Sequence, residues 1–107
     1  MWILGGQSGS SYLNNVYSSE DGEIWEQESD AGWSGRYGHA AVVYDSKIWV
    51  IGGTTSLYIE NDVWYSSDGT NWTQATSSAA WVGRTGLTSV EFDNKMWILG
   101  GNRNFDN

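Results

Sequence analysis

The chain of 107 residues contains no cysteine and no proline, and only five of its residues are lysine or arginine. Without cysteine it can form no disulfide, no thiolate metal site and no cysteine nucleophile. Five cations against 13 acidic residues leave a net charge of −8. This balance argues against nucleic acid and membrane partners, because phosphate groups are bound by clustered basic side chains. No apolar run approaches the roughly 18 residues of a membrane helix, and the composition leaves the compartment open.

Aromatic residues, by contrast, are abundant: they make up 15% of the chain and include eight tryptophans. This composition fits a well-buried β fold and argues against disorder. The stretch Gly38–Gly53 holds two short apolar runs, His39–Tyr44 and Ile48–Ile51, around a turn that begins at Asp45. Runs of this kind predict an antiparallel hairpin. Neither run alternates cleanly between apolar and polar residues, so we expect other sheets to cover both faces.

The hairpin is part of a repeat. It returns as Gly86–Gly101, and its second half opens the chain as Met1–Gly6. The glycine pairs that end the three copies lie 47 and 48 residues apart. A period of this length with four strands per repeat is typical of propeller blades. Two further blocks return in phase: Asn14–Trp25 as Asn61–Trp72, and the loop W-x-G-R-x-G at Trp33–Gly38 as Trp81–Gly86.

This pattern resembles the kelch family of β-propellers. Kelch blades carry an arginine before the first strand, a glycine pair ending the second, an aromatic residue in the third and a tryptophan near the fourth. The matching residues are Arg36 and Arg84; Gly5-Gly6, Gly52-Gly53 and Gly100-Gly101; Tyr17 and Trp64; and Trp25 and Trp72. The resemblance covers nearly the whole chain and implies an all-β fold of kelch-type propeller blades, each with four antiparallel strands.

On this basis residues 1–107 form a single unit of two and a fraction blades. Residues 1–30 are predicted to be a partial blade with strands two to four, 31–77 a complete blade, and 78–107 a partial blade with strands one and two. In the complete blade we expect strands at Gly38–Tyr44, Lys47–Gly53, Asn61–Ser67 and Asn71–Thr76. The first partial blade is expected to have strands at Met1–Gly6, Asn14–Ser19 and Glu23–Glu28, with a loop over Gln7–Leu13.

The number of blades is small for a propeller, which typically closes with about four to eight. The two ends are complementary, because the C-terminal part supplies first and second strands while the N-terminal part supplies the second to the fourth. We therefore expect a homo-oligomer joined head to tail, a trimer or tetramer with about six or eight blades. Met1–Gly6 and Met96–Gly101 then compete for one position. The alternative is that the chain is a piece of a longer protein.

Few residues suggest catalysis. The single histidine, His39, starts an inner strand, and its counterpart one repeat later is Leu87, which favours a packing role. We expect no catalytic residue, no cofactor and no metal site. The tryptophans of the second and outer strands are expected in the core. They are Trp2, Trp25, Trp49, Trp72 and Trp97.

The loops offer the best candidates for binding. In kelch propellers the loop entering each blade and the loop between its second and third strands lie on one face around the channel mouth. The resemblance therefore implies ligand-binding candidates Trp33, Arg36, Tyr37, Tyr58, Trp81 and Arg84, with Tyr12 beside them. Tryptophan can stack on a sugar or anchor a peptide, and arginine can bind a carboxylate. The structural alternative is that the arginines pair with a carboxylate or carbonyl of a blade and the tryptophans pack between blades.

These observations together predict a non-catalytic binding or assembly module. We expect it to associate with itself into a multi-chain propeller ring that binds a glycan or a protein segment at its central face. Two alternatives stay open at this point. One is a fragment or remnant of a propeller enzyme, such as an epimerase, a lyase or a glycan-processing enzyme, and the other is a pure self-assembling building unit.

Overall fold

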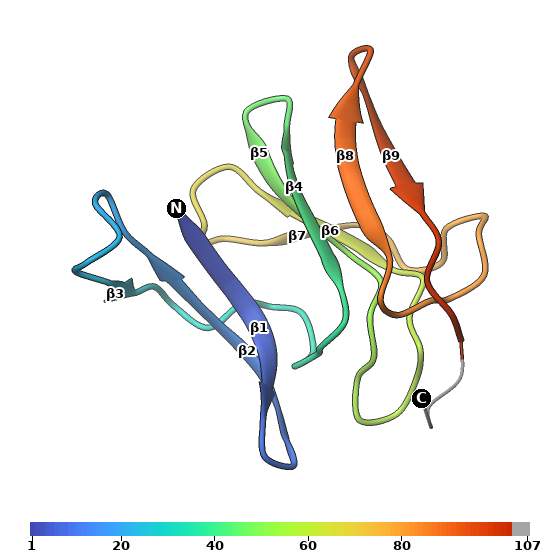
Figure 1. Ribbon diagram of the computed structural model, residues 1–107, viewed down its shortest axis with the longest axis horizontal. Helices are drawn as coiled ribbons and strands as arrows, with labels where there is room; N and C mark the ends of the chain where they lie inside the picture. Colours follow the sequence, from blue (N-terminus) through green and yellow to red (C-terminus); the bar gives the residue numbers. More distant parts are fainter. Residues whose placement is uncertain (104–107) are drawn as a thin grey trace.

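The computed structural model describes residues 1–103, which contain nine β-strands and no helix. The strands form three antiparallel sheets that stand side by side in chain order (Figure 1). We call them blades 1, 2 and 3. Blade 1 holds β1 (Trp2–Ser8), β2 (Ser11–Ser18) and β3 (Glu26–Gln27). Blade 2 holds β4 (Ala40–Tyr44), β5 (Lys47–Ile51), β6 (Val63–Ser66) and β7 (Thr73–Thr76), and blade 3 holds β8 (Thr88–Phe92) and β9 (Lys95–Leu99).

This architecture confirms the all-β prediction of kelch-type blades. Within each blade the strands are ordered as in the sequence, each antiparallel to the one before. The strands predicted for blade 2 are all present, with ends shortened by a few residues. The end of the predicted partial blade, residues 104–107, lies outside the described residues. Within residues 1–103 no helix has the length and apolar character needed to cross a membrane.

The hairpins of blades 2 and 3 have the same turn. Asp45 and Ser46 have φ angles of 53° and 57°, and Asp93 and Asn94 have 56° and 58°. Two successive residues with positive φ are typical of a two-residue turn whose twist matches that of the flanking strands, and Asp and Asn tolerate this conformation. The turn residues therefore fix the register of both hairpins.

Two details of blade 1 differ from the expectation. The prediction of a loop over Gln7–Leu13 is wrong, because β1 and β2 continue until only Gly9 and Ser10 separate them. Gly9 has a φ of 60°, which allows the tight turn. The outer strand is also shorter than predicted, since the Asp21 carboxylate accepts hydrogen bonds from the amides of Glu23 and Ile24 and holds them in a turn.

The core consists of two clusters, one in each gap between neighbouring blades. The first contains Val16, Ala31, Trp33 and Val50, with Leu4, Trp64 and Trp72 packed against it. The second contains Ala40, Ile51 and Leu87, with Val42, Trp49, Val63, Trp81 and Ile98 packed against it. Each blade therefore buries its apolar side chains against the next blade, as the hairpin pattern predicted.

Of the five tryptophans expected in the core, only Trp49 and Trp72 pack against a core cluster, and Trp25 is partly buried outside both clusters. Trp2 and Trp97 remain 37% and 44% exposed. Both lie in the partial blades at the two ends of the chain. In the described part of the chain no first strand accompanies β1, and no further blade packs on the outer face of blade 3. Their burial requires sheets that this part of the chain does not supply.

Candidate functional site

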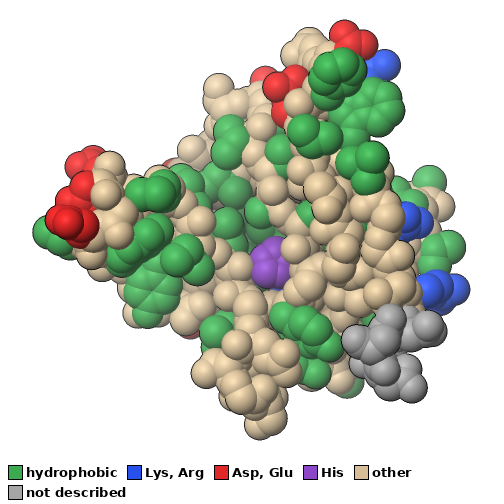
Figure 2. All heavy atoms as spheres, in the orientation of Figure 1, with side chains coloured by type: hydrophobic (Ala, Val, Ile, Leu, Met, Phe, Trp, Pro, Cys, Tyr) green, Lys and Arg blue, Asp and Glu red, His purple; other side chains and the backbone are tan. Residues whose placement is uncertain are grey.

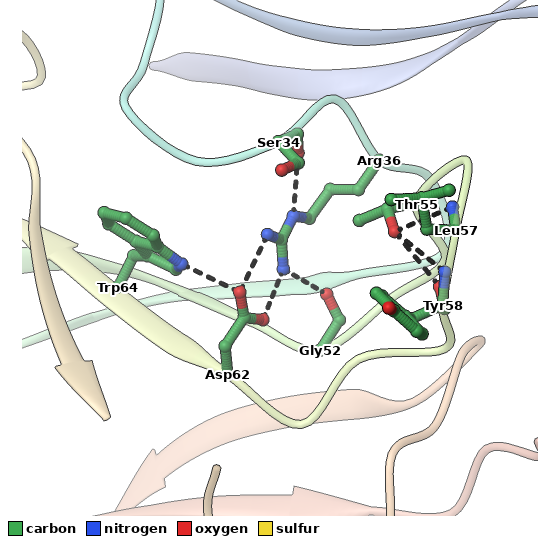
Figure 3. A network of polar contacts seen from close by, with 8 residues as sticks. All are labelled: Ser34, Arg36, Gly52, Thr55, Leu57, Tyr58, Asp62 and Trp64. Carbon is green, nitrogen blue, oxygen red and sulfur yellow. Dashed lines mark hydrogen bonds and ion pairs between the residues drawn. The ribbon is translucent and has the colours of Figure 1, made fainter. Parts of the chain in front are cut away.

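The loop that enters blade 2 is anchored by Arg36 (Figure 3). Its guanidinium group donates two hydrogen bonds to the Asp62 carboxylate, at 2.7 and 3.0 Å. It also donates to the carbonyl oxygens of Gly52, at 2.9 Å, and Ser34, at 3.1 Å. Asp62 accepts a further bond from the Trp64 indole at 2.9 Å. One buried side chain thus ties the entry loop to the end of β5 and the start of β6.

Trp33 lies beside this network. The side chains of Trp33 and Arg36 are both 1% exposed, and the Arg36 guanidinium lies 5.7 Å from the centre of the Trp33 ring. The Trp72 ring meets Trp33 edge-on at 5.7 Å. The structure thus places Trp33 and Arg36 in the framework between blades, not on the surface proposed from sequence. This burial corresponds to the structural alternative, because a side chain enclosed in this way meets no external ligand.

Arg84 occupies the same place in blade 3. It donates to the carbonyl oxygens of Val82, at 3.1 Å, and Gly100, at 3.2 Å. Its guanidinium lies 5.8 Å from the centre of the Trp81 ring. These contacts repeat those of Arg36 at positions 48 residues later. Within residues 1–103, however, Arg84 forms no ion pair, and it is only half-buried.

Among the candidate residues Tyr58 is exposed, and Tyr12 and Tyr37 are partly buried nearby. The rings of Tyr12 and Tyr37 lie 5.1 Å apart, and the backbone of Tyr37 forms two hydrogen bonds with Thr54, at the start of the β5–β6 loop. In that loop Leu57 and Tyr58 are 73% and 63% exposed. The tip of the β1–β2 hairpin and the β5–β6 loop project on the same side of the molecule (Figure 1). We call Tyr12, Tyr37, Leu57 and Tyr58 the tyrosine face.

The conformation of this loop is set by Thr55. The Thr55 hydroxyl accepts hydrogen bonds from the amides of Leu57, at 3.3 Å, and Tyr58, at 3.1 Å (Figure 3). The Thr55 amide donates to the Tyr58 carbonyl at 2.9 Å. These bonds close a tight turn that presents both side chains outward. Leu57 was missed in the sequence because a single leucine in a polar loop is a weak signal.

His39 lies in the gap between blades 1 and 2. Figure 2 shows its imidazole at the bottom of a hollow in the middle of the molecule. One ring nitrogen, Nε2, lies 2.8 Å from the Leu4 carbonyl oxygen, so it carries the proton and donates it. Burial lowers the pKa of His39, the Leu4 carbonyl opposes this shift, and the nearby positive charge of Arg36 adds to it. The geometry is that of a packing residue, since no carboxylate among the described residues is hydrogen-bonded to the ring.

The aspartates of the two Asp-Gly turns also have a local role. Asp21 and Asp68 each accept hydrogen bonds from two backbone amides of their own turn. These bonds stabilise the charged form and lower the pKa of both carboxyl groups. Within the part of the chain that the structure describes, no group of three or more histidine, aspartate or glutamate side chains is arranged to hold a metal ion.

Comparison with known families agrees with this geometry. Residues 35–65 match the family model described as the Kelch motif. These residues carry a kelch repeat, and over this segment the chain is similar to the kelch-repeat family. The matched segment of this kelch chain includes Arg36, the glycine pair Gly52-Gly53, and Asp62 with Trp64, which are the residues that join the entry loop to β5 and β6. A search of curated proteins gave no match. Kelch repeats generally build non-catalytic binding modules and scaffolds, and the repeat marks this chain as propeller blades of an interaction module.

Proposed function

We propose that this kelch chain is a non-catalytic binding module that associates with further copies of itself into a ring and presents the tyrosine face to a protein segment. The observation that supports self-association is the unpaired edge of blade 3 and the exposed apolar side chains beside it. Its two strands end at an edge that no strand of the described chain pairs with. Its exposed apolar side chains are Val90, Phe92, Trp97 and Leu99. An unpaired edge beside exposed apolar residues favours association.

The tyrosine face supports the second part. Tyr58 and Leu57 offer apolar surface with a hydroxyl group at its rim, which suits the side chains of a peptide. The net charge of −8 favours a segment with basic residues through long-range attraction. A glycan would use the same aromatic rings, so the binding experiment includes both ligand classes.

Self-association is tested by the mass in solution. We expect light scattering across a concentration series to give the mass of three or four chains, because two repeats per chain then complete about six or eight blades. Sedimentation velocity on the same samples checks that the species is discrete. A chain that stays monomeric at every concentration would remove the ring from the proposal.

Ligand binding is tested with peptide and glycan arrays probed with the full chain and with Tyr58→Ala. We expect basic, aromatic-containing peptides to bind and the substitution to reduce binding about tenfold, because Tyr58 is 63% exposed and central to the face. The melting temperature of the Tyr58→Ala variant should equal that of the unmodified chain. Ile24→Ala serves as the matched control, since Ile24 is 71% exposed but lies in the β2–β3 turn. Equal binding by Tyr58→Ala and the full chain would show that another surface is used, and binding to glycans alone would change the ligand class.

A further inference from the structure

Arg84 and Asn15 each lack the partner that their counterparts in blade 2 have. Asn61-Asp62 aligns with Asn14-Asn15, and the side chains of Asn61 and Asn14 make the same bonds to loop carbonyls. Asn15 therefore occupies in blade 1 the position from which Asp62 binds Arg36. Within residues 1–103 the Asn15 side chain forms no hydrogen bond, while Arg84 has no ion pair.

The strands next to these two residues are interchangeable. Met1–Gly6 and Met96–Gly101 have the same sequence, MWILGG. The first copy lies in β1 and pairs with β2, with Trp2 opposite Ser18 and Ile3 opposite Tyr17. The hexapeptide at Met96–Gly101 begins in β9, which pairs only with β8 among the described strands. Strand pairing depends on the backbone and on alternating side chains, so β9 can form the same ladder with β2 of a second copy.

The other contacts of β1 can be made by β9 as well. The Gly6 amide donates to the Arg36 carbonyl at 2.8 Å, and the Leu4 carbonyl binds His39. The Trp2 ring lies against Gly69, where even a Cβ atom would collide with it. The residues identical to Gly6, Leu4 and Trp2 are Gly101, Leu99 and Trp97, which lie in β9 or just after it. Each would therefore find the same partner on a second copy.

Blade 3 has exposed apolar side chains that could pack against a second protein chain. Val42 and Ile51 pack in the core cluster between blades 2 and 3. Their counterparts 48 residues later, Val90 and Leu99, are 44% and 52% exposed. In the place of Leu4, Leu99 would be packed against the first core cluster of a second copy, which recovers apolar burial that the single chain lacks.

We propose that copies of this chain join by strand exchange. The β8–β9 hairpin of one copy docks on β2 of the next in the place of β1, Met1–Gly6 is released, and Arg84 reaches the side-chain oxygen of Asn15 on the second copy. The result is a complete four-stranded blade in the order β8, β9, β2, β3. This mechanism rests on the proposed self-association, which it extends by naming the strands and side chains that meet.

The hairpin docks intact because its own contacts hold β9 in place. A two-residue turn joins β8 to β9, Arg84 binds the Gly100 carbonyl, and Thr85 and Asn102 exchange backbone hydrogen bonds of 2.8 and 2.9 Å. Among the described strands β1 and β9 each pair with one strand, but β9 brings its partner β8 with it, whereas the partner of β1 is β2, the strand for which the two compete. The released strand is therefore β1.

The first test is a double-mutant cycle on the full-length chain, followed by sedimentation equilibrium. Asn15→Asp copies the residue at Asp62 and supplies Arg84 with a carboxylate, so we expect association to tighten by about tenfold or more. Arg84→Ala should weaken association, and the gain from Asn15→Asp should vanish when both changes are combined. A gain of the same size in the Arg84→Ala background would overturn the contact.

The second test compares Leu99→Asp with the matched change Leu4→Asp in the identical hexapeptide. Leu99→Asp should abolish association without lowering the melting temperature of the monomer, because Leu99 is exposed there. Leu4→Asp weakens β1 in its own sheet and should increase the assembled fraction, because β1 is the strand that is displaced. Circular dichroism checks that both variants fold. If Leu4→Asp does not fold, the double-mutant cycle of Asn15 and Arg84 decides whether strands are exchanged.

The outcomes separate this mechanism from self-association in general. If the unmodified chain assembles and neither Leu99→Asp nor Asn15→Asp changes the association constant, the ring stands and strand exchange is overturned. If the unmodified chain and Asn15→Asp are both monomeric at every concentration, self-association and strand exchange are overturned together. Assembly that responds in opposite directions to Leu99→Asp and Leu4→Asp supports the exchange.

Discussion

Blades 2 and 3 begin with the same loop, arginine and hairpin, yet one arginine is enclosed and the other is open. Arg36 and Arg84 make the same two carbonyl bonds and lie at nearly the same distance from a tryptophan. Within residues 1–103 only Arg36 has a carboxylate partner, Asp62, which precedes the third strand of its blade. The comparison shows that bonds formed within an entry loop and its hairpin are local, whereas burial depends on later strands and neighbouring blades.

The hairpin tryptophans show the same contrast between a local hydrogen bond, which is present in both blades, and burial, which differs. The indole of Trp49 donates to the Tyr44 carbonyl at 2.9 Å, and that of Trp97 donates to the Phe92 carbonyl at 2.8 Å. The local bond is the same in both blades. Trp49 packs against the second core cluster, while Trp97 stays 44% exposed. The reason is that β6 pairs with the second edge of β5, whereas no described strand pairs with the corresponding edge of β9.

The largest difference between the blades should appear when each arginine is removed. Arg36→Ala leaves Asp62 buried without its partner, so we expect a loss of about 3–5 kcal/mol in the free energy of unfolding. Arg84→Ala removes only two bonds at a half-exposed site and should cost about 1 kcal/mol or less. Urea denaturation at a concentration where the chain is monomeric measures both values.

Arg36→Ala combined with Asp62→Ala controls for this result. Removing both partners relieves the buried charge, so the double variant should be less unstable than the sum of the two single variants. Equal losses for Arg36→Ala and Arg84→Ala would contradict the view that the later strands give Arg36 its importance.

A smaller difference is expected for the tryptophans beside these arginines. Trp33 is 1% exposed and its indole nitrogen has no hydrogen-bond partner among residues 1–103. Trp33→Phe should therefore cost about 2 kcal/mol through lost volume, with no hydrogen bond to lose. Trp81→Phe should cost about 1 kcal/mol or less, because Trp81 is only partly buried. Thermal unfolding followed by near-ultraviolet circular dichroism compares the two, and a larger loss for Trp81→Phe would argue against the assigned core.

The smallest effect concerns His39 and its counterpart Leu87. Burial lowers the pKa of His39 below its ordinary value of 6.5, so the unfolded chain takes up a proton more readily than the folded one. Stability from this residue is therefore complete above about pH 6.5 and is lost as the pH falls through the folded pKa. His39→Leu, which copies Leu87, should be less sensitive to pH between about 7.5 and 5.5. Parallel urea titrations of both proteins test this, and identical slopes would show that His39 is not buried as described.

Much of the fold could be predicted from the sequence because the repeat is local. The Asp-Ser and Asp-Asn turns, the glycine pairs and the spacing of the apolar runs indicated the hairpins, and blade 2 formed as expected. The loop over Gln7–Leu13 was predicted wrongly. Seven residues separate the glycine pair from the asparagine in both blade 1 and blade 2, so the length of the segment gave no sign of a difference. Their conformations differ because Gly9 allows a tight turn in one and the Thr55 hydroxyl closes another turn in the other.

The candidate site was harder to predict, because the sequence assigned one role to residues that occupy different environments. Trp33 and Arg36 matched the pattern of surface-loop residues, but the next strands of blade 2 and the facing side of blade 1 enclose them. Tyr58 is exposed and Tyr37 is partly buried, and their binding role stays a prediction. Leu57 joins them only because a hydroxyl bond in its loop turns it outward.

By itself the sequence determined the repeating unit, since turn residues, glycine pairs and apolar runs act over a few neighbouring positions. The tertiary structure decided which copy of each residue is buried. Arg36 and Arg84 have the same local sequence pattern, but burial results from packing between sheets that are distant in the chain. Only blade 2 has all four strands and a neighbour on each side within the described residues, so its arginine alone is enclosed.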